Sequence, residues 1–124
     1  MNAVPIGTFV RARVPFQEGD GRYKIRPVLI LGRARTPKGD VVYIGAAKFS
    51  SSAKVRGEVE VILTDAEARA VGLEGEGVLR FSRQSLVAFL DQDVISEGRS
   101  YKALPNTKAL AIENAARAVR FPLA

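Results

Sequence analysis

The chain has 124 residues, a length typical of one domain, and 47% of them are hydrophobic, which is enough for a globular core. Its 19 lysines and arginines outnumber its 13 acidic residues, and the net charge of +6 favours a polyanionic or acidic partner. Cysteine and histidine are absent, which excludes a disulfide framework, a thiolate or imidazole metal site and Ser-His-Asp catalysis.

The termini and the apolar segments give no sign of a membrane protein. The N-terminus lacks the apolar run of a signal peptide, and no window reaches the roughly 18 apolar residues of a membrane span. We therefore expect a cytoplasmic protein without a membrane partner.

The first half of the chain predicts three strands. Residues 8–14 alternate in polarity, residues 28–31 form a short apolar run, and residues 41–49 are rich in β-branched residues. A glycine-rich loop is expected over residues 15–24, and the turn residues at 36–40 predict that the second and third strands pair as a hairpin.

Arg26 precedes Pro27 at the start of the second apolar run. Proline fixes its own φ and pushes the preceding residue towards extended backbone. The sequence therefore predicts that Arg26 lies at an ordered junction between loop and strand rather than within a strand, where its guanidinium would be held still.

The second half predicts three more strands and a short helix. Residues 58–62 alternate, and 77–81 and 85–90 are short apolar segments. Between them, Thr64 and Glu67 match a capping box and Gly72 matches a helix end, so a helix of about two turns is expected.

An alanine-rich helix is expected at the C-terminus, over residues 106–120. Asn106 or Thr107 would cap it. The apolar residues expected on one face are Leu110, Ile112, Ala116 and Val119. The whole chain, 1–124, is thus predicted to be a single mainly β (α+β) domain, a strongly bent sheet or barrel of five to six strands with one short helix and one C-terminal helix.

Several landmarks of the chain resemble the PemK/MazF family of toxin endoribonucleases. They are Gly7 before the first strand, the polar glycine-rich loop, Ile25-Arg26-Pro27-Val28-Leu29-Ile30, a strand that runs into small hydroxyl residues, and Val71-Gly72-Leu73 before Gly77-Val78-Leu79-Arg80. Their order covers residues 7 to about 95. The resemblance implies an SH3-like barrel of toxin type, a homodimer, metal-independent cleavage of single-stranded RNA without a cofactor, and inhibition by a small acidic antitoxin.

The resemblance also implies roles for three residues. Arg26 matches the catalytic arginine, Ser50 the hydroxyl residue that donates to the scissile phosphate, and Arg80 a second active-site arginine. The register of Ser50 against Ser51 and Ser52 stays open. Metal-free cleavage uses the 2′-hydroxyl as nucleophile, so stabilisation of charge on the phosphoryl oxygens should dominate, and arginine suits it as a permanently charged planar donor.

Ser82 departs from the family pattern. Some relatives carry a carboxylate two residues after the second arginine, and serine is a poor general base. Asp20 or Glu18, in the loop before Arg26, are the alternative candidates for this role.

A positively charged groove can be assembled from several strands. Its candidate RNA-binding residues are Arg11, Arg13, Lys24, Lys48, Ser51 and Ser82 beside Arg26 and Arg80, with Tyr23 and Phe49 stacking on unpaired bases.

Each assignment has a plain structural alternative. Arg26 can form an ion pair at the start of a strand, residues 50–52 can be a solvated turn, and Arg80 can point to solvent. Glu18 and Asp20 can be ordinary loop acids, and Tyr23 and Phe49 can be packing residues. For the whole chain, the alternative to a nuclease is a catalytically inactive barrel that binds nucleic acid or an acidic, antitoxin-like protein.

Overall fold

A computed structural model of the chain describes residues 3–15, 21–50 and 58–123. Three predicted site residues, Glu18, Asp20 and Ser51, lie outside these ranges. None of the helices in the described ranges is long and apolar enough to cross a membrane.

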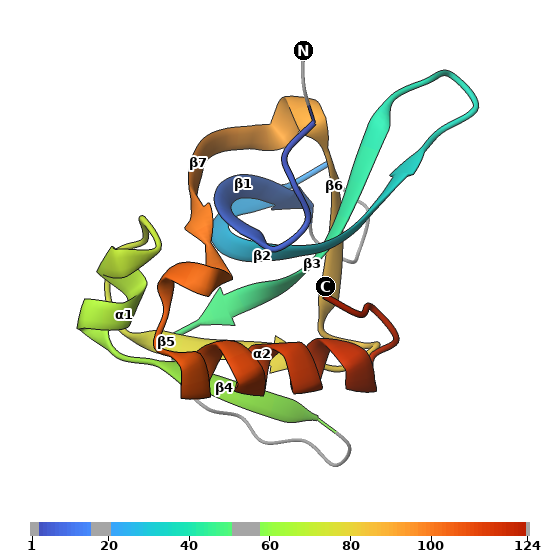
Figure 1. The fold of residues 1–124 in the computed structure, drawn as a ribbon. Helices are drawn as coiled ribbons and strands as arrows, with labels where there is room; N and C mark the ends of the chain where they lie inside the picture. Colours follow the sequence, from blue (N-terminus) through green and yellow to red (C-terminus); the bar gives the residue numbers. More distant parts are fainter. Residues whose placement is uncertain (1–2, 16–20, 51–57, 124) are drawn as a thin grey trace.

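The described residues form seven antiparallel strands and two α-helices, so the protein is mainly β (Figure 1). The strands are β1 Thr8–Pro15, β2 Tyr23–Arg35, β3 Val41–Phe49, β4 Val59–Leu63, β5 Gly77–Phe81, β6 Leu86–Leu90 and β7 Val94–Ser100. The helices are α1 Asp65–Ala70 and α2 Asn106–Ala118, with short 3-10 turns η1 Asp91–Asp93 and η2 Tyr101–Ala103. The seven strands exceed the predicted five to six, because the sequence pattern did not predict β7.

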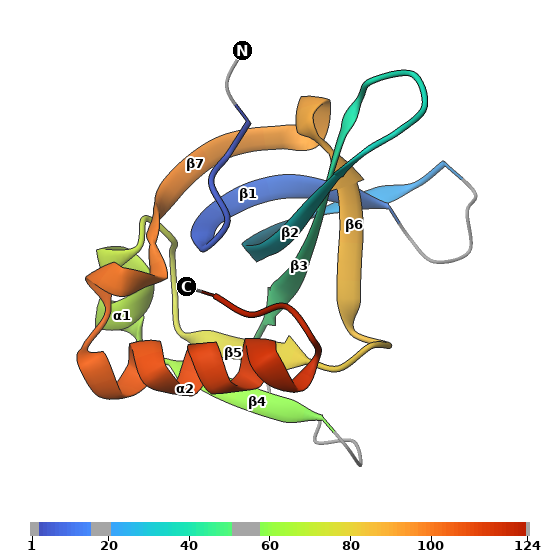
Figure 2. The same cartoon turned by 45° about the vertical axis from the view of Figure 1, so that its right-hand side comes forward.

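The strands form one bent sheet in the order β4-β5-β3-β2-β1-β7, with β6 paired to β3 beside this path. The predicted hairpin of β2 and β3 is confirmed. Strand β3 belongs to both parts of the sheet, because residues 42–46 pair with β6 whereas Lys48 and Phe49 pair with β5. In Figure 2, β4 and β5 lie apart from β1 and β2, and α2 lies across β4 and β5.

Two apolar clusters stabilise the two faces of the sheet. One joins the helices to the sheet and includes Phe9, Leu29, Leu79 and Ile112, and the other includes Tyr43 and lies on the opposite face. Alternation along the strands explains the division, since neighbouring residues of a strand point to opposite faces.

Helix α1 forms as predicted. The Thr64 hydroxyl accepts from the Glu67 N–H at 3.1 Å, and the Glu67 carboxylate accepts from the Thr64 N–H at 2.9 Å. Gly72 follows with a φ of +85°, the left-handed conformation that ends many helices.

Two expectations for the C-terminal helix were wrong. Its N-cap is Pro105, without a side-chain cap, and Asn106 is already the first helical residue. Proline suits this place because its fixed φ is compatible with the start of a helix. Leu110 is 56% exposed, whereas Ala115 is buried, because the helix is rotated to place its small residues on the sheet.

The prediction that Arg26 lies at a loop-to-strand junction was also wrong, because β2 begins at Tyr23 and Arg26 pairs with Ala12 inside the strand. Pro27 does not interrupt β2. Pairing between β2 and β3 begins only at Val28. Pro27 lies before the paired residues, so its missing N–H costs no hydrogen bond to β3.

Candidate functional site

The sheet divides next to Arg26. On one side β2 continues back from Pro27 to Tyr23 paired with β1, and on the other side Lys48 and Phe49 of β3 turn to pair with Leu79 and Val78 of β5. The end of β3 thus lies between two strands that are not neighbours in the sheet. This is where side chains from β2, β3 and β5 meet.

Two arginines lie over one aromatic ring at this division. The guanidinium carbon of Arg26 is 4.6 Å from the ring centroid of Phe49, and that of Arg80 is 4.2 Å from the same centroid. Both distances fall within the roughly 6 Å range of cation–π attraction. The pair is therefore held by the ring despite its like charges.

Glu60 completes this group. It lies directly opposite Arg80 in the β4–β5 pair, and its Oε2 is 3.6 Å from Nε of Arg80. The two side chains are little exposed, at 8% for Glu60 and 17% for Arg80. The four residues Arg26, Phe49, Glu60 and Arg80 are called the arginine cluster below.

Burial and the positive charge of Arg80 together lower the pKa of Arg26. Arginine is not deprotonated in proteins at neutral pH, so Arg26 carries a positive charge. A lowered pKa means that the charged form lies in an unfavourable environment, which an anion between the two guanidiniums would relieve.

The strand register places the cations of the predicted groove on two different faces of the sheet. Residues that pair directly across antiparallel strands share a face. Arg26 pairs with Ala12, and Lys24 with Val14, so these cations lie on the face of the Tyr43 cluster. Arg11 and Arg13 alternate with Ala12 and lie on the other face.

Tyr23 and Lys48 are also separated from the arginine cluster. Tyr23 is exposed and lies 5.8 Å from the guanidinium of Arg13. Lys48 pairs with Leu79, on the opposite face from Phe49, and its ammonium donates to the carbonyl of Glu74 at 3.2 Å. Burial lowers the pKa of Lys48.

The structure describes two of the predicted hydroxyl residues, Ser50 and Ser82. Ser50 follows Phe49 directly and is exposed. Ser82 comes two residues after Arg80, and its hydroxyl donates to the hydroxyl of Ser85 at 2.9 Å. Ser51, Asp20 and Glu18 lie outside the described residues, so their predicted roles stay predictions.

Sequence reasoning missed the two carboxylates of β4. Glu58 is 8% exposed and accepts from the Ser85 hydroxyl at 2.7 Å, and Glu60 pairs with Arg80. The alternation of residues 58–62 does place Glu58 and Glu60 on one face of a strand. Their nearness to Arg80 depends on the pairing of β4 with β5, which the pattern does not specify.

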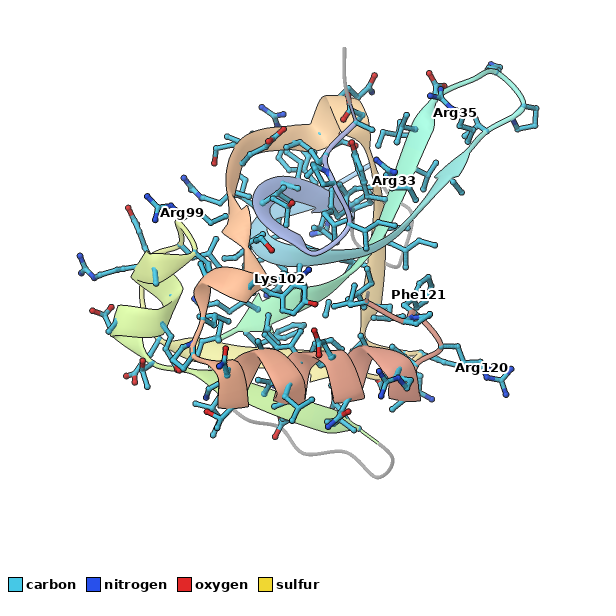
Figure 3. All side chains as sticks on the ribbon, in the orientation of Figure 1. Arg33, Arg35, Arg99, Lys102, Arg120 and Phe121 are labelled. Atoms are coloured by element: carbon cyan, nitrogen blue, oxygen red, sulfur yellow. The ribbon has the colours of Figure 1, made fainter. Side chains whose placement is uncertain are left out.

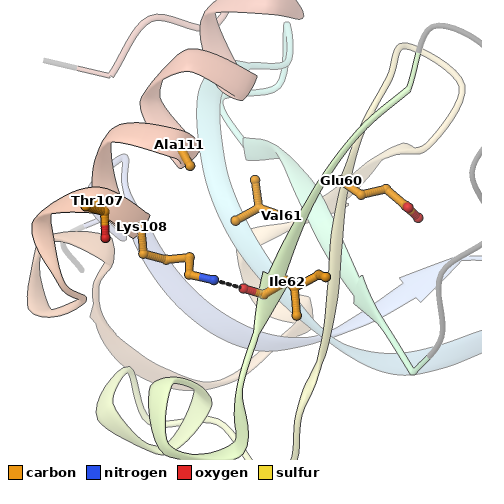
Figure 4. Close-up of a pocket in the computed structure, with 6 residues that line it drawn as sticks. All are labelled: Glu60, Val61, Ile62, Thr107, Lys108 and Ala111. Carbon is orange, nitrogen blue, oxygen red and sulfur yellow. Dashed lines mark hydrogen bonds between the residues drawn. The ribbon is translucent and has the colours of Figure 1, made fainter.

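A separate pocket lies behind β4. It has a volume of about 370 Å³ and lies between β4 and α2, lined by Ile62 and Lys108 among others. In Figure 4 the ammonium of Lys108 meets the backbone carbonyl of Ile62, whereas the carboxylate of Glu60 points away from Lys108. Glu60 therefore borders both this pocket and the arginine cluster.

Among residues 3–15, 21–50 and 58–123, no three acidic side chains gather closely enough to hold a metal ion. Comparison of the chain with protein-family models found no matching family, and a search of curated proteins found no match.

Proposed function

We propose that the protein is a metal-independent endoribonuclease toxin of the PemK/MazF type, built on an SH3-like barrel, which cleaves single-stranded RNA by attack of a 2′-hydroxyl on the adjacent phosphate. The observation that carries the proposal is the placement of Arg26 and Arg80 over the ring of Phe49. These two arginines come from strands that are not neighbours in the sheet, and both match arginines of the family pattern.

The chemistry needs positive charge fixed where negative charge develops. As the 2′-oxygen attacks, charge accumulates on the phosphoryl oxygens, and preorganised donors stabilise this state more than the ground state. Arginine offers a planar fork that binds two phosphate oxygens at once. Because Arg26 is partly withdrawn from water, its interaction with a phosphate is stronger than that of a solvated cation.

In this proposal, Phe49 positions the guanidiniums of Arg26 and Arg80. Attraction to the ring holds each guanidinium near Phe49, and Glu60 compensates part of their charge. Stacking of Phe49 on an RNA base stays a prediction. Ser50, next in the chain and exposed, is the proposed hydroxyl donor to the phosphate.

The partners follow from the same proposal. A net charge of +6 fits single-stranded RNA and a small acidic antitoxin protein. A homodimer is proposed from the family resemblance, with cytoplasmic action on messenger RNA.

The test is cleavage of a mixed single-stranded RNA in the presence of EDTA by wild type, Arg26→Ala and Arg35→Ala. Arg35 is the matched control, because it belongs to the same strand but lies far along the β2–β3 hairpin (Figure 3), where it donates to the carbonyl of Gly39 at 3.0 Å. We expect wild type and Arg35→Ala to cut at a short recurring sequence and Arg26→Ala to lose this activity. RNA left intact by wild type refutes the nuclease proposal.

The second candidate is an inactive module that binds RNA through the same cluster. The ion pair of Arg80 with Glu60 favours it, because that carboxylate competes with a phosphate for the guanidinium. Salt-sensitive RNA binding without cleavage would identify this alternative.

A further inference from the structure

A chain of hydrogen bonds leads from Ser82 to a buried carboxylate. The Ser82 hydroxyl donates to the Ser85 hydroxyl at 2.9 Å, and the Ser85 hydroxyl donates to Oε1 of Glu58 at 2.7 Å. The N–H of Ser85 donates to the Ser82 oxygen at 3.1 Å, which fixes the distance between the two serines. The two serine hydroxyls thus donate in one direction, from Ser82 through Ser85 to Glu58, while the N–H of Ser85 donates back to Ser82.

This chain begins on the face of the arginine cluster. Ser82 follows Arg80 by two residues and comes directly after Phe81, the last residue of β5, so the alternation of β5 extended by one residue brings it to the side of Arg80. Glu58 precedes Glu60 by two residues and comes directly before β4, whose first residue Val59 pairs with Phe81, so Glu58 lies next to Ser82 at the same end of the β4–β5 pair. The chain therefore lies beside the guanidinium that the proposed function assigns to the phosphate.

A turn alone does not require the carboxylate. The Ser82 oxygen already accepts the N–H of Ser85, and the Ser82 carbonyl accepts the N–H groups of Ser85 and Leu86, which closes the turn between β5 and β6. Glu58 is 8% exposed, and burying a carboxylate is unfavourable unless hydrogen bonds compensate for the lost water. An apolar residue at position 58 would close the same turn without this loss.

We propose that Ser82, Ser85 and Glu58 form a proton relay in which Glu58 is the final base of the RNA cleavage, an inference that rests on the proposed function. A serine oxygen has two acceptor lone pairs, and Ser85 occupies one of those of Ser82. The second accepts the proton of the RNA 2′-hydroxyl. The relay thereby supplies at position 82 the basicity that a serine lacks by itself.

Every proton that moves in the proposed reaction is accounted for. As the bond from the 2′-oxygen to phosphorus forms, its proton passes to Ser82, the proton of Ser82 passes to Ser85, and that of Ser85 passes to the carboxylate of Glu58. The bond from phosphorus to the 5′-oxygen breaks, and this oxygen leaves with the electron pair and takes a proton from water. The hydroxide that remains removes the proton from Glu58. Ser82 touches the substrate and is the catalytic residue, whereas Ser85 and Glu58 act through it.

The test compares single-turnover cleavage rates of Ser85→Ala, Ser85→Thr and Glu58→Gln with wild type. Loss of general base catalysis typically lowers a rate by about 10²–10⁴-fold, and we expect this loss for Ser85→Ala and Glu58→Gln. Ser85→Thr keeps the hydroxyl and should recover most of the activity. Ser100→Ala is the matched control, because the Ser100 hydroxyl accepts the N–H of Lys102 at the end of β7, which lies at the opposite edge of the strand order from β4.

Two further measurements separate a relay from a structural role. Binding of an RNA whose 2′-hydroxyl is replaced by hydrogen should be the same for wild type and Ser85→Ala. The cleavage rate of wild type, plotted against the deuterium fraction of the solvent, should curve because several protons move together. Wild-type rates for Ser85→Ala would overturn the relay and leave the nuclease intact, whereas an inactive wild type would overturn both. If Glu58→Gln does not fold, the comparison of Ser85→Ala with Ser85→Thr still tests the relay.

Discussion

Arg26 and Arg80 approach the same ring, that of Phe49, to within 4.6 and 4.2 Å of its centroid. Burial, and after it the positive charge of Arg80, lower the pKa of Arg26. The protein holds the two guanidiniums with an aromatic ring and one carboxylate. A phosphate between the guanidiniums would remove the repulsion, which makes the arrangement suited to binding an anion.

Phe49→Leu should weaken the site without unfolding the protein. Leucine keeps an apolar side chain but loses the attraction to both guanidiniums, each about 0.5–2 kcal/mol. We expect RNA affinity to fall by about tenfold, which corresponds to roughly 1.4 kcal/mol. Phe49→Tyr keeps the ring and is the control. Equal affinities for the leucine and tyrosine variants, measured by fluorescence anisotropy, would contradict the holding role.

Arg26→Lys should separate charge from geometry. Lysine keeps the positive charge, so the salt dependence of RNA binding should stay as in wild type, while Arg26→Ala should lower the slope by about one. Lysine lacks the planar fork, and we expect the cleavage rate to fall by about 10²–10³-fold, the usual effect of losing one oriented donor. A lysine variant that cleaves like wild type would show that Arg26 contributes charge alone.

Glu60→Gln should destabilise the fold. Removing the carboxylate leaves Arg80 beside Arg26 in a little-exposed site, and breaking such a pair typically costs about 3–5 kcal/mol when it is fully buried. The side chain of Arg80 is 17% exposed, so we expect about 1–3 kcal/mol by urea unfolding. Glu74→Gln, at an exposed position, is the control and should change the unfolding free energy little. A Glu60→Gln protein as stable as this control would contradict the compensating role.

Tyr101 should make stability fall at alkaline pH. Burial and the hydrogen bond to Glu113, 2.6 Å long, raise its pKa to about 12. The unfolded chain loses this proton near pH 10 and the folded chain near 12, so the contribution of Tyr101 is complete below about pH 10 and is lost between the two values. Between pH 9 and 12 the unfolding free energy of wild type should fall more than that of Tyr101→Phe. Parallel curves for the two proteins would contradict this assignment.

The sequence pattern predicted most elements because their signals are local. The capping box at Thr64 and the hairpin of β2 and β3 depend on neighbouring residues, and both are present. Strand β7 was missed because its pattern is polar and contains Gly98. A Cβ at that residue would meet the backbone carbonyl of Val71, so the glycine allows the strand to pack against the end of α1.

The candidate site was predicted in part. Arg26, Phe49 and Arg80 were all singled out, and the structure brings them together. Arg11 and Arg13 were placed in the same groove, but alternation against Ala12 puts them on the other face. Glu60 was not predicted because its contact with Arg80 depends on which strands pair, and the sequence spacing does not specify that pairing.

The chemical groups at the ends of the cleaved RNA show whether the 2′-hydroxyl is the nucleophile. A short RNA with one cleavage site is incubated with the protein in EDTA, and the products are weighed by mass spectrometry. Attack by the 2′-hydroxyl predicts a 2′,3′-cyclic phosphate on one product and a 5′-hydroxyl on the other, and no such products from Arg26→Ala. Products with a 3′-hydroxyl and a 5′-phosphate would contradict attack by the 2′-hydroxyl, and the same cyclic phosphate from Arg26→Ala would contradict the catalytic role of Arg26.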